Sequence, residues 1–256
     1  MRIRYMVTSL SIGTGGLGRF GNQMWTIAGC IGIARANGMD FAFPKWINYD
    51  NALFGGNRDD FSQYFVNPLP LLPAGRNWQE YGYFWGYRDV KLQRGDWSIN
   101  AHLQSHKFFE HCIEEVRHYF TMQNEPYQND YCAIHVRAGD YVDDPNAYHP
   151  RCSEEYYQKA IAMMPAGTKF IVFSDDYEFA KNRVKVDGLY VSGNYIEDFK
   201  MMKKCKHFII ANSSFSAMAA LLADHPEKIV IAPERWFGPH VDISAKDIFH
   251  PKWIVI

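Results

Sequence analysis

The sequence lacks three features that often assign a chain to a class: a long apolar run, an excess of charge of one sign, and a regular cysteine pattern. Its longest apolar stretches, residues 27–34 and 217–223, fall far short of the roughly 20 residues that span a bilayer. Lys and Arg number 27 against 28 Asp and Glu, so no long-range field would attract a nucleic acid or an anionic membrane. An anionic ligand must therefore be held by a few well-placed groups.

Metal and disulfide patterns are also missing. The five cysteines are an odd number, are widely spaced and include no CxxC pair, which argues against a disulfide framework or a zinc site. His102 and His106 are spaced as in the zinc motif HExxH, but Leu103 stands in place of the glutamate. We therefore expect no metal ion. The first residues show neither a long apolar core nor a small-residue cleavage site, so we expect a cytoplasmic protein.

The second half of the chain alternates strand-length apolar runs with helix-length segments. Strands are expected over 131–136, 169–173, 189–191, 207–211 and 228–231. Helices are expected over 153–163, 176–183, 196–205 and 215–223. Such alternation predicts an α/β fold with a mainly parallel sheet covered by helices.

The first half of the chain is less regular. The pattern predicts two strands, a glycine-rich turn and two helices, with the strands over 4–10 and 41–43 and the helices over 22–37 and 107–122. From Pro44 to about Gly95 the chain is rich in Asn, Gly, Pro and aromatic residues, and no regular structure is predicted there.

A linker is expected at the polar stretch 123–130, which contains Pro126. The chain of 256 residues is long enough for two small domains with their own cores. We therefore place an N-terminal domain at 1–125 and a C-terminal domain at 126–256.

Polar segments follow four of the expected strands. They read GTGGLGRFGNQ (13–23), HVRAGD (135–140), SDD (174–176) and NSS (212–214). Ligands of open parallel sheets bind outside the carboxyl ends of the strands. These segments are therefore the candidate ligand-binding residues.

The first segment contains Gly13, Gly15 and Gly18 in GxGxxG spacing between a strand and a helix. A dinucleotide site would also need an acidic residue at the end of the second strand, and none stands there. Two other interpretations stay open. The glycines either permit a tight turn, or they expose backbone amides that face an anionic or sugar ligand together with Asn22.

Arg137 is the strongest candidate in the HVRAGD segment. Its guanidinium offers a fixed fork of donors that suits a pyrophosphate and stays charged at any working pH. Alternatively, it forms a buried ion pair with Asp140. Asp140 is either this partner or a carboxylate that accepts a proton. His135 is either a neighbour of the ligand or a core histidine.

The SDD and NSS segments each allow two interpretations. Asp175 either caps the next helix or accepts a hydrogen bond from a nucleobase. The amides and hydroxyls of NSS either bind a phosphate, or Asn212 or Ser213 simply caps the helix that follows. A group of aromatic residues is either core or a carbohydrate-binding groove: Trp78, Tyr81, Tyr83, Phe84, Trp85 and Tyr87.

Four motifs in this order resemble the alpha-1,2-fucosyltransferase family of bacteria and animals. They are GRFGNQMW (18–25), HVRAGDY (135–141), FSDD (173–176) and MMKKCKHFIIANSSFSAMAALL (201–222), of which the last is long and specific. The resemblance covers both halves of the chain, although residues 46–94 carry little of it. The GRFGNQ motif also resembles a motif of the protein O-fucosyltransferases, which belong to the same superfamily.

This resemblance implies a GT-B architecture, with two Rossmann-like domains facing a cleft. The acceptor-side domain would precede the linker and the GDP-sugar-binding domain would follow it. The implied reaction moves L-fucose with inversion from GDP-fucose to a glycan hydroxyl, with an alpha-1,2 linkage to galactose. The donor is a substrate, and no cofactor, nucleic acid or membrane segment is expected. The alternatives are another GDP-hexose, another fucosyl linkage, or a catalytically silent nucleotide-binding or glycan-binding module.

The resemblance also implies roles for single residues. Arg137 would bind the diphosphate and neutralise departing GDP, with His135 beside it. Asp175 would meet the guanosine. Along the phosphate and the sugar would lie Ser213, Ser214 and Phe215.

The remaining catalytic roles fall on the glycine loop and on three carboxylates. Gly21 and Asn22 would close the opposite wall, and Asn22 joins Arg137 and Asp140 as a catalytic candidate. Asp143 and Asp144 are alternatives to Asp140 as general base. The chain departs from the family pattern at two places, with Ala138 in place of a usual second arginine and Ala217–Met218 in place of a Trp-Trp pair. The oligomeric state is left open.

Overall fold

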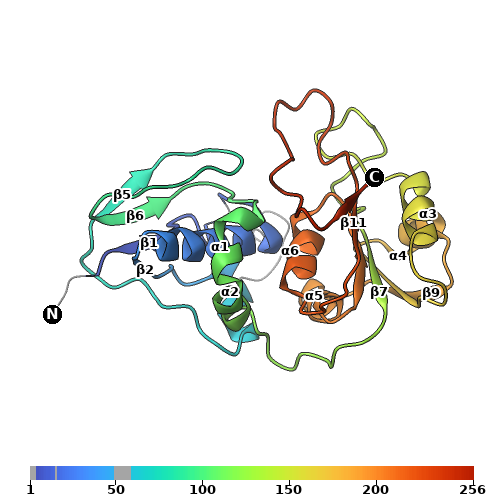
Figure 1. The fold of residues 1–256 in the computed structure, drawn as a ribbon, viewed down its shortest axis with the longest axis horizontal. Helices are drawn as coiled ribbons and strands as arrows, with labels where there is room; N and C mark the ends of the chain where they lie inside the picture. Colours follow the sequence, from blue (N-terminus) through green and yellow to red (C-terminus); the bar gives the residue numbers. More distant parts are fainter. Residues whose placement is uncertain (1–3, 15, 49–58) are drawn as a thin grey trace. The chain divides into compact units, whose positions relative to one another are not determined.

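The computed structural model describes residues 4–14, 16–48 and 59–256. The chain forms two compact units (Figure 1). The first comprises Met1–Gln123 with Lys246–Ile248, and the second comprises Asn124–Ala245 with Phe249–Ile256. A short segment near the end of the chain therefore returns to the first unit.

The first unit is built on a four-stranded parallel sheet with the strand order β2-β1-β6-β5. The strands are β1 Met6–Thr8, β2 Asp40–Phe41, β5 Trp78–Tyr81 and β6 Asp96–Ile99. A separate antiparallel pair joins β3 Ile47–Asn48 to β4 Asp59–Asp60. Strands β3, β4 and β5 lie where the sequence predicts no regular structure. All four residues of β5 pair with β6, so long-range pairing creates this strand.

Helix α1, Phe20–Ala36, confirms the helix expected at 22–37. All its residues from Phe20 to Ala34 except Asn22 are buried. Two glycines let a later segment approach the helix closely. A Cβ atom on Gly32 would lie 1.9 Å from the backbone oxygen of Phe108, and one on Gly29 would lie 2.6 Å from the Cβ atom of Leu103.

The helix expected at 107–122 is interrupted. Two 3₁₀ turns, η3 His106–Phe108 and η4 Glu110–Cys112, precede the short helix α2 Ile113–Tyr119. The backbone leaves helical geometry at Phe109, where φ is -131°. The Phe109 ring is buried edge-on against Trp25, with the ring centroids 5.7 Å apart. Burial of the Phe109 ring accounts for the break in the helix. Elsewhere in this unit, the 3₁₀ turn η2 Phe61–Tyr64 also buries an aromatic ring, that of Phe61.

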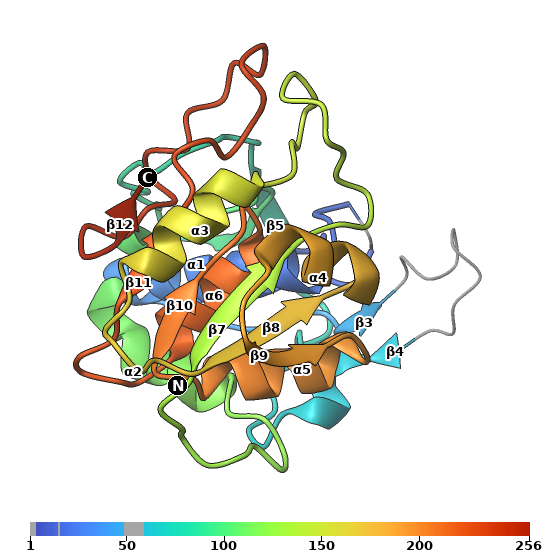
Figure 2. The same ribbon diagram turned by 90° about the vertical axis from the view of Figure 1, so that its right-hand side faces the viewer.

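The second unit contains a six-stranded parallel sheet with the order β12-β11-β10-β7-β8-β9 (Figure 2). Its strands are β7 Cys132–Val136, β8 Phe170–Ser174, β9 Gly188–Val191, β10 His207–Ile209, β11 Val230–Ala232 and β12 Ile254–Val255. The predicted parallel α/β fold is therefore confirmed. The sequence does not predict strand β12, because its two residues are too few to show a strand pattern.

Four helices cover this sheet on both faces: α3 Glu154–Ala162, α4 Tyr177–Val184, α5 Tyr195–Lys203 and α6 Ser214–Leu222. Alternate residues of a strand face opposite sides. Ile134 and Val136 of β7 belong to a core cluster with residues of α3 and α4, which lie in front of the strands in Figure 2. His135 instead contacts α6, on the other face.

Capping residues begin three of these helices. Ser153 caps α3 and Asn194 caps α5, each through a side-chain oxygen that accepts a backbone N–H. Asp176 does the same for α4. The five cysteines are all unpaired thiols. In the part of the chain that the structure describes, no helix is both long and apolar enough to cross a membrane.

Candidate functional site

The second unit brings three of the four polar segments to one edge of its sheet. Arg137 follows the last residue of β7, Asp175 follows β8, and residues 212–214 lie where the chain after β10 enters α6. These three strands are neighbours in the parallel sheet, in the order β10-β7-β8. Their carboxyl ends therefore form one continuous edge. The glycine loop and Asn22 belong to the first unit.

Arg137 is held between two carboxylates at this edge. Its Nη1 atom lies 2.5 Å from Oδ2 of Asp175, and its Nη2 atom pairs with Asp140. The guanidinium also lies over the Tyr141 ring, 5.6 Å from its centroid. The Arg137 side chain is 20% exposed and that of Asp140 is 50% exposed. The ion pair with Asp140 expected as an alternative to ligand binding is therefore present, but it is partly exposed rather than buried, and Asp175 joins it.

Asp175 organises the loop after β7. One carboxylate oxygen accepts hydrogen bonds from the backbone N–H groups of Ala138, at 2.8 Å, and Gly139, at 3.2 Å. A Cβ atom on Gly139 would lie 2.5 Å from the other oxygen, so a larger residue here would force the carboxylate or the loop to move. The interpretation of Asp175 as a helix cap is wrong. Asp176 caps α4 by accepting from Phe179 N at 3.0 Å, because Asp175 is held by the loop and by Arg137.

Two further arginines support the same loop, and no sequence motif marks them. Arg151 donates from Nε and Nη2 to the Ala138 carbonyl oxygen, both at 3.1 Å. Asp143 accepts from Arg151 Nη1 at 3.3 Å and from Arg183 Nη2 at 2.5 Å. The Ala138 residue is therefore held on its N–H by Asp175 and on its C=O by Arg151.

A cavity of about 540 Å³ adjoins this support. Arg151, Asp143 and Arg183 line it together with residues of the α3 start and of the segment after β11. Its walls combine apolar groups such as Tyr156 with charged side chains of both signs. The residues that fix the Arg137 loop thus also border a space of ligand size.

His135 is buried and connects β7 to α6. Its Nδ1 atom lies 2.9 Å from Ser216 Oγ, and its ring centroid lies 5.5 Å from that of Phe215. Burial, followed by the charge of Arg137, lowers the pKa of His135 to about 3. The imidazole is therefore neutral near pH 7. Of the two interpretations, the structure places His135 in the core, one residue before Val136 at the strand end.

The start of α6 is not capped in the expected way. Ser213 occupies the N-cap position, but its side chain makes no capping hydrogen bond. The Asn212 side chain is buried and donates to the carbonyl oxygens of Pro150 and Trp236, both at 3.0 Å. The prediction of N-capping by Asn212 or Ser213 is therefore wrong, because the Asn212 amide is used to join two loops. Ser214 and Phe215 lie in the first turn of α6 and are partly exposed.

In the first unit, Gln23 rather than Asn22 organises the glycine loop. Its Oε1 atom accepts from Gly13 N at 3.3 Å and from Trp46 Nε1 at 2.7 Å, while Nε2 donates to the Gly18 carbonyl oxygen at 2.9 Å. Gly13 and Gly18 have positive φ angles of 74° and 77°, which only glycine adopts readily. Gly15 lies outside the described residues. The tight-turn interpretation therefore accounts for these two glycines.

Gly21 and Asn22 lie in the first turn of α1. Gly21 is buried, whereas Asn22 is partly exposed and accepts a hydrogen bond from Gln104 Nε2 at 2.9 Å. Neither of them shares a unit with Arg137.

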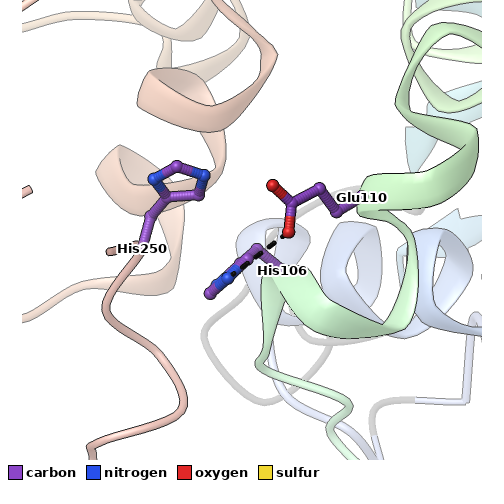
Figure 3. A group of neighbouring side chains, drawn as sticks. All are labelled: His106, Glu110 and His250. Carbon is purple, nitrogen blue, oxygen red and sulfur yellow. Dashed lines mark ion pairs between the residues drawn. The ribbon is translucent and has the colours of Figure 1, made fainter. Parts of the chain in front are cut away.

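His102 and His106, which are spaced as in a zinc motif, lie in different surroundings. His106 Nε2 lies 3.7 Å from Glu110 Oε2, a pair within the first unit that Figure 3 shows. The third side chain in that view, His250, belongs to the second unit. His102 is flanked by Tyr83 and Trp85. The aromatic group is thus divided, with Phe84 buried and Tyr83 exposed.

The sequence also matches known proteins. The model of glycosyl transferase family 11 matches residues 34–256. The chain belongs to this family. An alpha-1,2-colitosyltransferase of Escherichia coli is 36% identical over 136 residues, which are 48% of this chain and 47% of that protein. Galactoside alpha-(1,2)-fucosyltransferase 2 of Sus scrofa is 23% identical over 280 residues, covering 89% of this chain and 79% of that protein.

The chain spans less than half the length of the Escherichia coli relatives that it matches. Among solved structures, the alpha-1,6-fucosyltransferase NodZ soaked with GDP-fucose aligns with a TM-score of 0.50 and 14% identity, covering 90% of this chain and 95% of NodZ. At this identity the likeness shows a shared fold. The resemblance to the alpha-1,2-fucosyltransferase family and the expected α/β fold with parallel sheets are both confirmed.

Proposed function

We propose that this family 11 member transfers L-fucose from GDP-fucose to a glycan hydroxyl and forms an alpha-1,2 linkage to galactose. Family membership supports sugar transfer, and the names of the similar proteins support the linkage. One observation carries the donor half of the proposal. Arg137 offers a guanidinium fork at the carboxyl edge of a parallel sheet, where nucleotide ligands of such sheets bind.

In this proposal the diphosphate takes the place of Asp140 on Arg137. The Asp140 side chain is 50% exposed, whereas that of Asp175 is 30% exposed and is also fixed by two backbone N–H groups. Displacing Asp140 from Arg137 therefore costs less free energy than displacing Asp175. The start of α6 would lie along the phosphate and the sugar, with Ser213 at the N-cap position and Ser214 and Phe215 in the first turn. Asp175 would contact the guanosine from its fixed position.

The reaction is a substitution at the anomeric carbon of fucose. The acceptor hydroxyl oxygen forms the new bond from the face opposite GDP, and the bond to the phosphate oxygen breaks with its electron pair leaving on GDP. Arg137 stabilises the charge that develops on this phosphate. A preorganised hydrogen-bond donor of this kind typically lowers the activation barrier by about 3 kcal/mol.

The proton of the acceptor hydroxyl needs a base. Displacement from Arg137 would free the Asp140 carboxylate for this task. Asp143 is held by two arginines, and Asp144 accepts from Asn146 N at 2.8 Å in a turn. We therefore propose Asp140 as the general base. His135 would act from the core by fixing α6 against β7, and Gly21 and Asn22 stay proposed contacts on the acceptor side.

We also propose that transfer needs no metal ion, since arginine and helix N–H groups supply the positive charge. EDTA should leave the rate unchanged, and stimulation by manganese would contradict this part of the proposal. A cytoplasmic location stays a prediction.

The test combines donor choice with linkage analysis. The protein is incubated with lactose and with GDP-fucose, GDP-colitose or GDP-mannose, and the products are analysed by NMR. We expect GDP-fucose to give equimolar GDP and an alpha-1,2-fucosylated galactose. Because one relative is a colitosyltransferase, colitose is the second candidate sugar. Binding of GDP without release of any sugar would support the silent binding module instead.

A further inference from the structure

At the carboxyl edge of the first sheet, two aromatic rings surround one histidine. His102 lies in the loop after β6, and Tyr83 and Trp85 lie in the loop after β5. The imidazole centroid is 6.1 Å from the Tyr83 ring, at an interplanar angle of 87°, and 5.7 Å from the Trp85 ring, at 67°. The Tyr83 side chain is 59% exposed. The rings therefore stand edge-on to the imidazole and stay accessible.

The His102 imidazole has an unsatisfied nitrogen. Its Nδ1 atom is buried and has no hydrogen-bond partner in the described part of the chain. Burial also lowers the pKa of His102, so the ring is neutral near pH 7. Buried polar atoms are almost always hydrogen-bonded, and an exception calls for an explanation. The side chain as a whole is only partly buried, so a ligand can contact the exposed part of the ring.

The backbone beside His102 is strained and firmly held. Leu103 adopts a left-handed conformation with φ of 49°, and its buried side chain packs against Gly29. Such strain in a bulky residue persists where surrounding structure imposes it, and it clusters at binding sites. Gln104, the next residue, donates to Asn22, and Thr26 Oγ1 donates to the Ala101 carbonyl oxygen at 3.2 Å.

The loop after β5 is fixed as well. The backbone N–H of Tyr87 donates to Asp247 Oδ2 at 3.0 Å, and Lys107 binds the other carboxylate oxygen of Asp247 at 2.7 Å. Gly86 has a positive φ of 76° in the turn between Trp85 and Tyr87. Both loops are therefore ordered before any ligand arrives, which lowers the entropy cost of binding.

The chemistry of this edge differs from that around Arg137. Besides the Lys107–Asp247 ion pair, it is tied together by hydrogen bonds between uncharged groups: Gln104 to Asn22, Thr26 to Ala101, Ser11 to Asn100 and Leu10 to Ser98. Aromatic rings and neutral polar groups suit a ligand with apolar ring faces and hydroxyl edges. We infer that His102, Tyr83 and Trp85 form the subsite that binds the uncharged acceptor sugar. This inference rests on the proposed function, since an acceptor sugar exists only if the protein transfers a sugar.

The first experiment measures sugar binding without any donor. Methyl β-D-galactoside is titrated into the full chain and followed by saturation-transfer NMR. We expect wild type to bind, and His102→Phe or Trp85→Ala to weaken binding about tenfold, the effect of one lost hydrogen bond or ring contact. His102→Gln keeps a hydrogen-bonding side chain and should lose less. Exposed His111 and Tyr127 provide the matched controls His111→Phe and Tyr127→Ala, which should bind like wild type.

The second experiment measures GDP affinity and melting temperature for the same variants, and both should stay at the wild-type value. The inference is overturned if wild type binds no galactoside, or if His102→Phe and Trp85→Ala bind it as wild type does. An equal loss of GDP affinity in the folded variants would also overturn it. Galactoside binding by wild type without any transfer from GDP-fucose would instead contradict the proposed function, and these residues would then form a galactose-binding site that serves no acceptor.

Discussion

Arg137 and Asp175 hold each other across neighbouring strands, with Nη1 of one 2.5 Å from Oδ2 of the other. The Asp175 carboxylate also binds the two N–H groups that follow Arg137 in the chain. One acidic residue therefore fixes both the guanidinium and the backbone that carries it. The direction of the Arg137 fork is set before a ligand binds.

Replacing Arg137 by alanine should abolish transfer and weaken GDP binding. The variant loses the donor fork and with it the ion pairs to Asp140 and Asp175, whose negative charge then repels the phosphates. We expect kcat to fall by about a factor of 100 to 1,000, the usual cost of one preorganised donor. Initial rates and calorimetric titration with GDP measure the two effects. The exposed Arg94 supplies the control Arg94→Ala, and unchanged turnover in Arg137→Ala would refute the donor assignment.

Replacing Asp140 by asparagine separates its two proposed roles. Loss of the competing carboxylate should tighten GDP binding, because the diphosphate no longer has to displace it from Arg137. Transfer should fall by about a factor of 100 or more if Asp140 is also the base. Tighter GDP binding with full transfer would show that Asp140 is only an ion-pair partner of Arg137 and that another group is the base.

Replacing Gly139 by alanine should disturb the Arg137 loop. The new Cβ atom would lie 2.5 Å from Asp175 Oδ2, so the carboxylate or the loop must move. We expect weaker GDP binding and a lower melting temperature. Gly193 has open space around the equivalent Cβ position and no positive φ, so Gly193→Ala is the matched control. Equal behaviour of the two variants would show that the loop tolerates the shift.

Stability should fall on acidification because of His135. Its pKa is about 3 in the folded state, against 6.5 ordinarily, so between these values the unfolded chain binds the extra proton. The stability that the neutral ring contributes is present above pH 6.5 and is lost as the pH falls towards 3. Between pH 7.5 and 5 the loss is about 2 kcal/mol.

Urea unfolding of wild type and His135→Asn at both pH values measures this loss. The variant should lose less stability than wild type. Burial raises the pKa of Asp198 to about 6, and this group titrates in the same range with the opposite sign. Only the difference between the two proteins therefore isolates His135. The same pH dependence in both would contradict a neutral buried imidazole.

The sequence predicts the second unit well, because its strands and helices are each specified locally. Ser153 starts its helix as expected, and Arg137, Asp175 and Ser213 stand at strand ends. The partners of these residues could not be predicted. Arg151 reaches Ala138 from 13 positions away, and only folding brings the two together.

The first unit is harder to predict because its strands depend on long-range pairing. The sequence predicts strands that overlap β1 and β2, but it does not predict β5 and β6, which have four residues each. Leu103 illustrates the same limit within the proposed sugar subsite. The residues around Leu103 in the sequence do not predict a left-handed backbone. The fold imposes this conformation by packing the Leu103 side chain against Gly29.

The return of Lys246–Ile248 to the first unit limits how this protein can be recombined. Asp247 in that segment anchors Lys107 and the Tyr87 backbone, so a gene cut at the 123/124 boundary would separate these loops from their anchor. Chimeras that exchange halves by a single crossover would combine Asp247 from one parent with loops from the other. A functional exchange of the first unit would need two further crossovers around Lys246–Ile248, so that this segment comes from the same parent as residues 1–123.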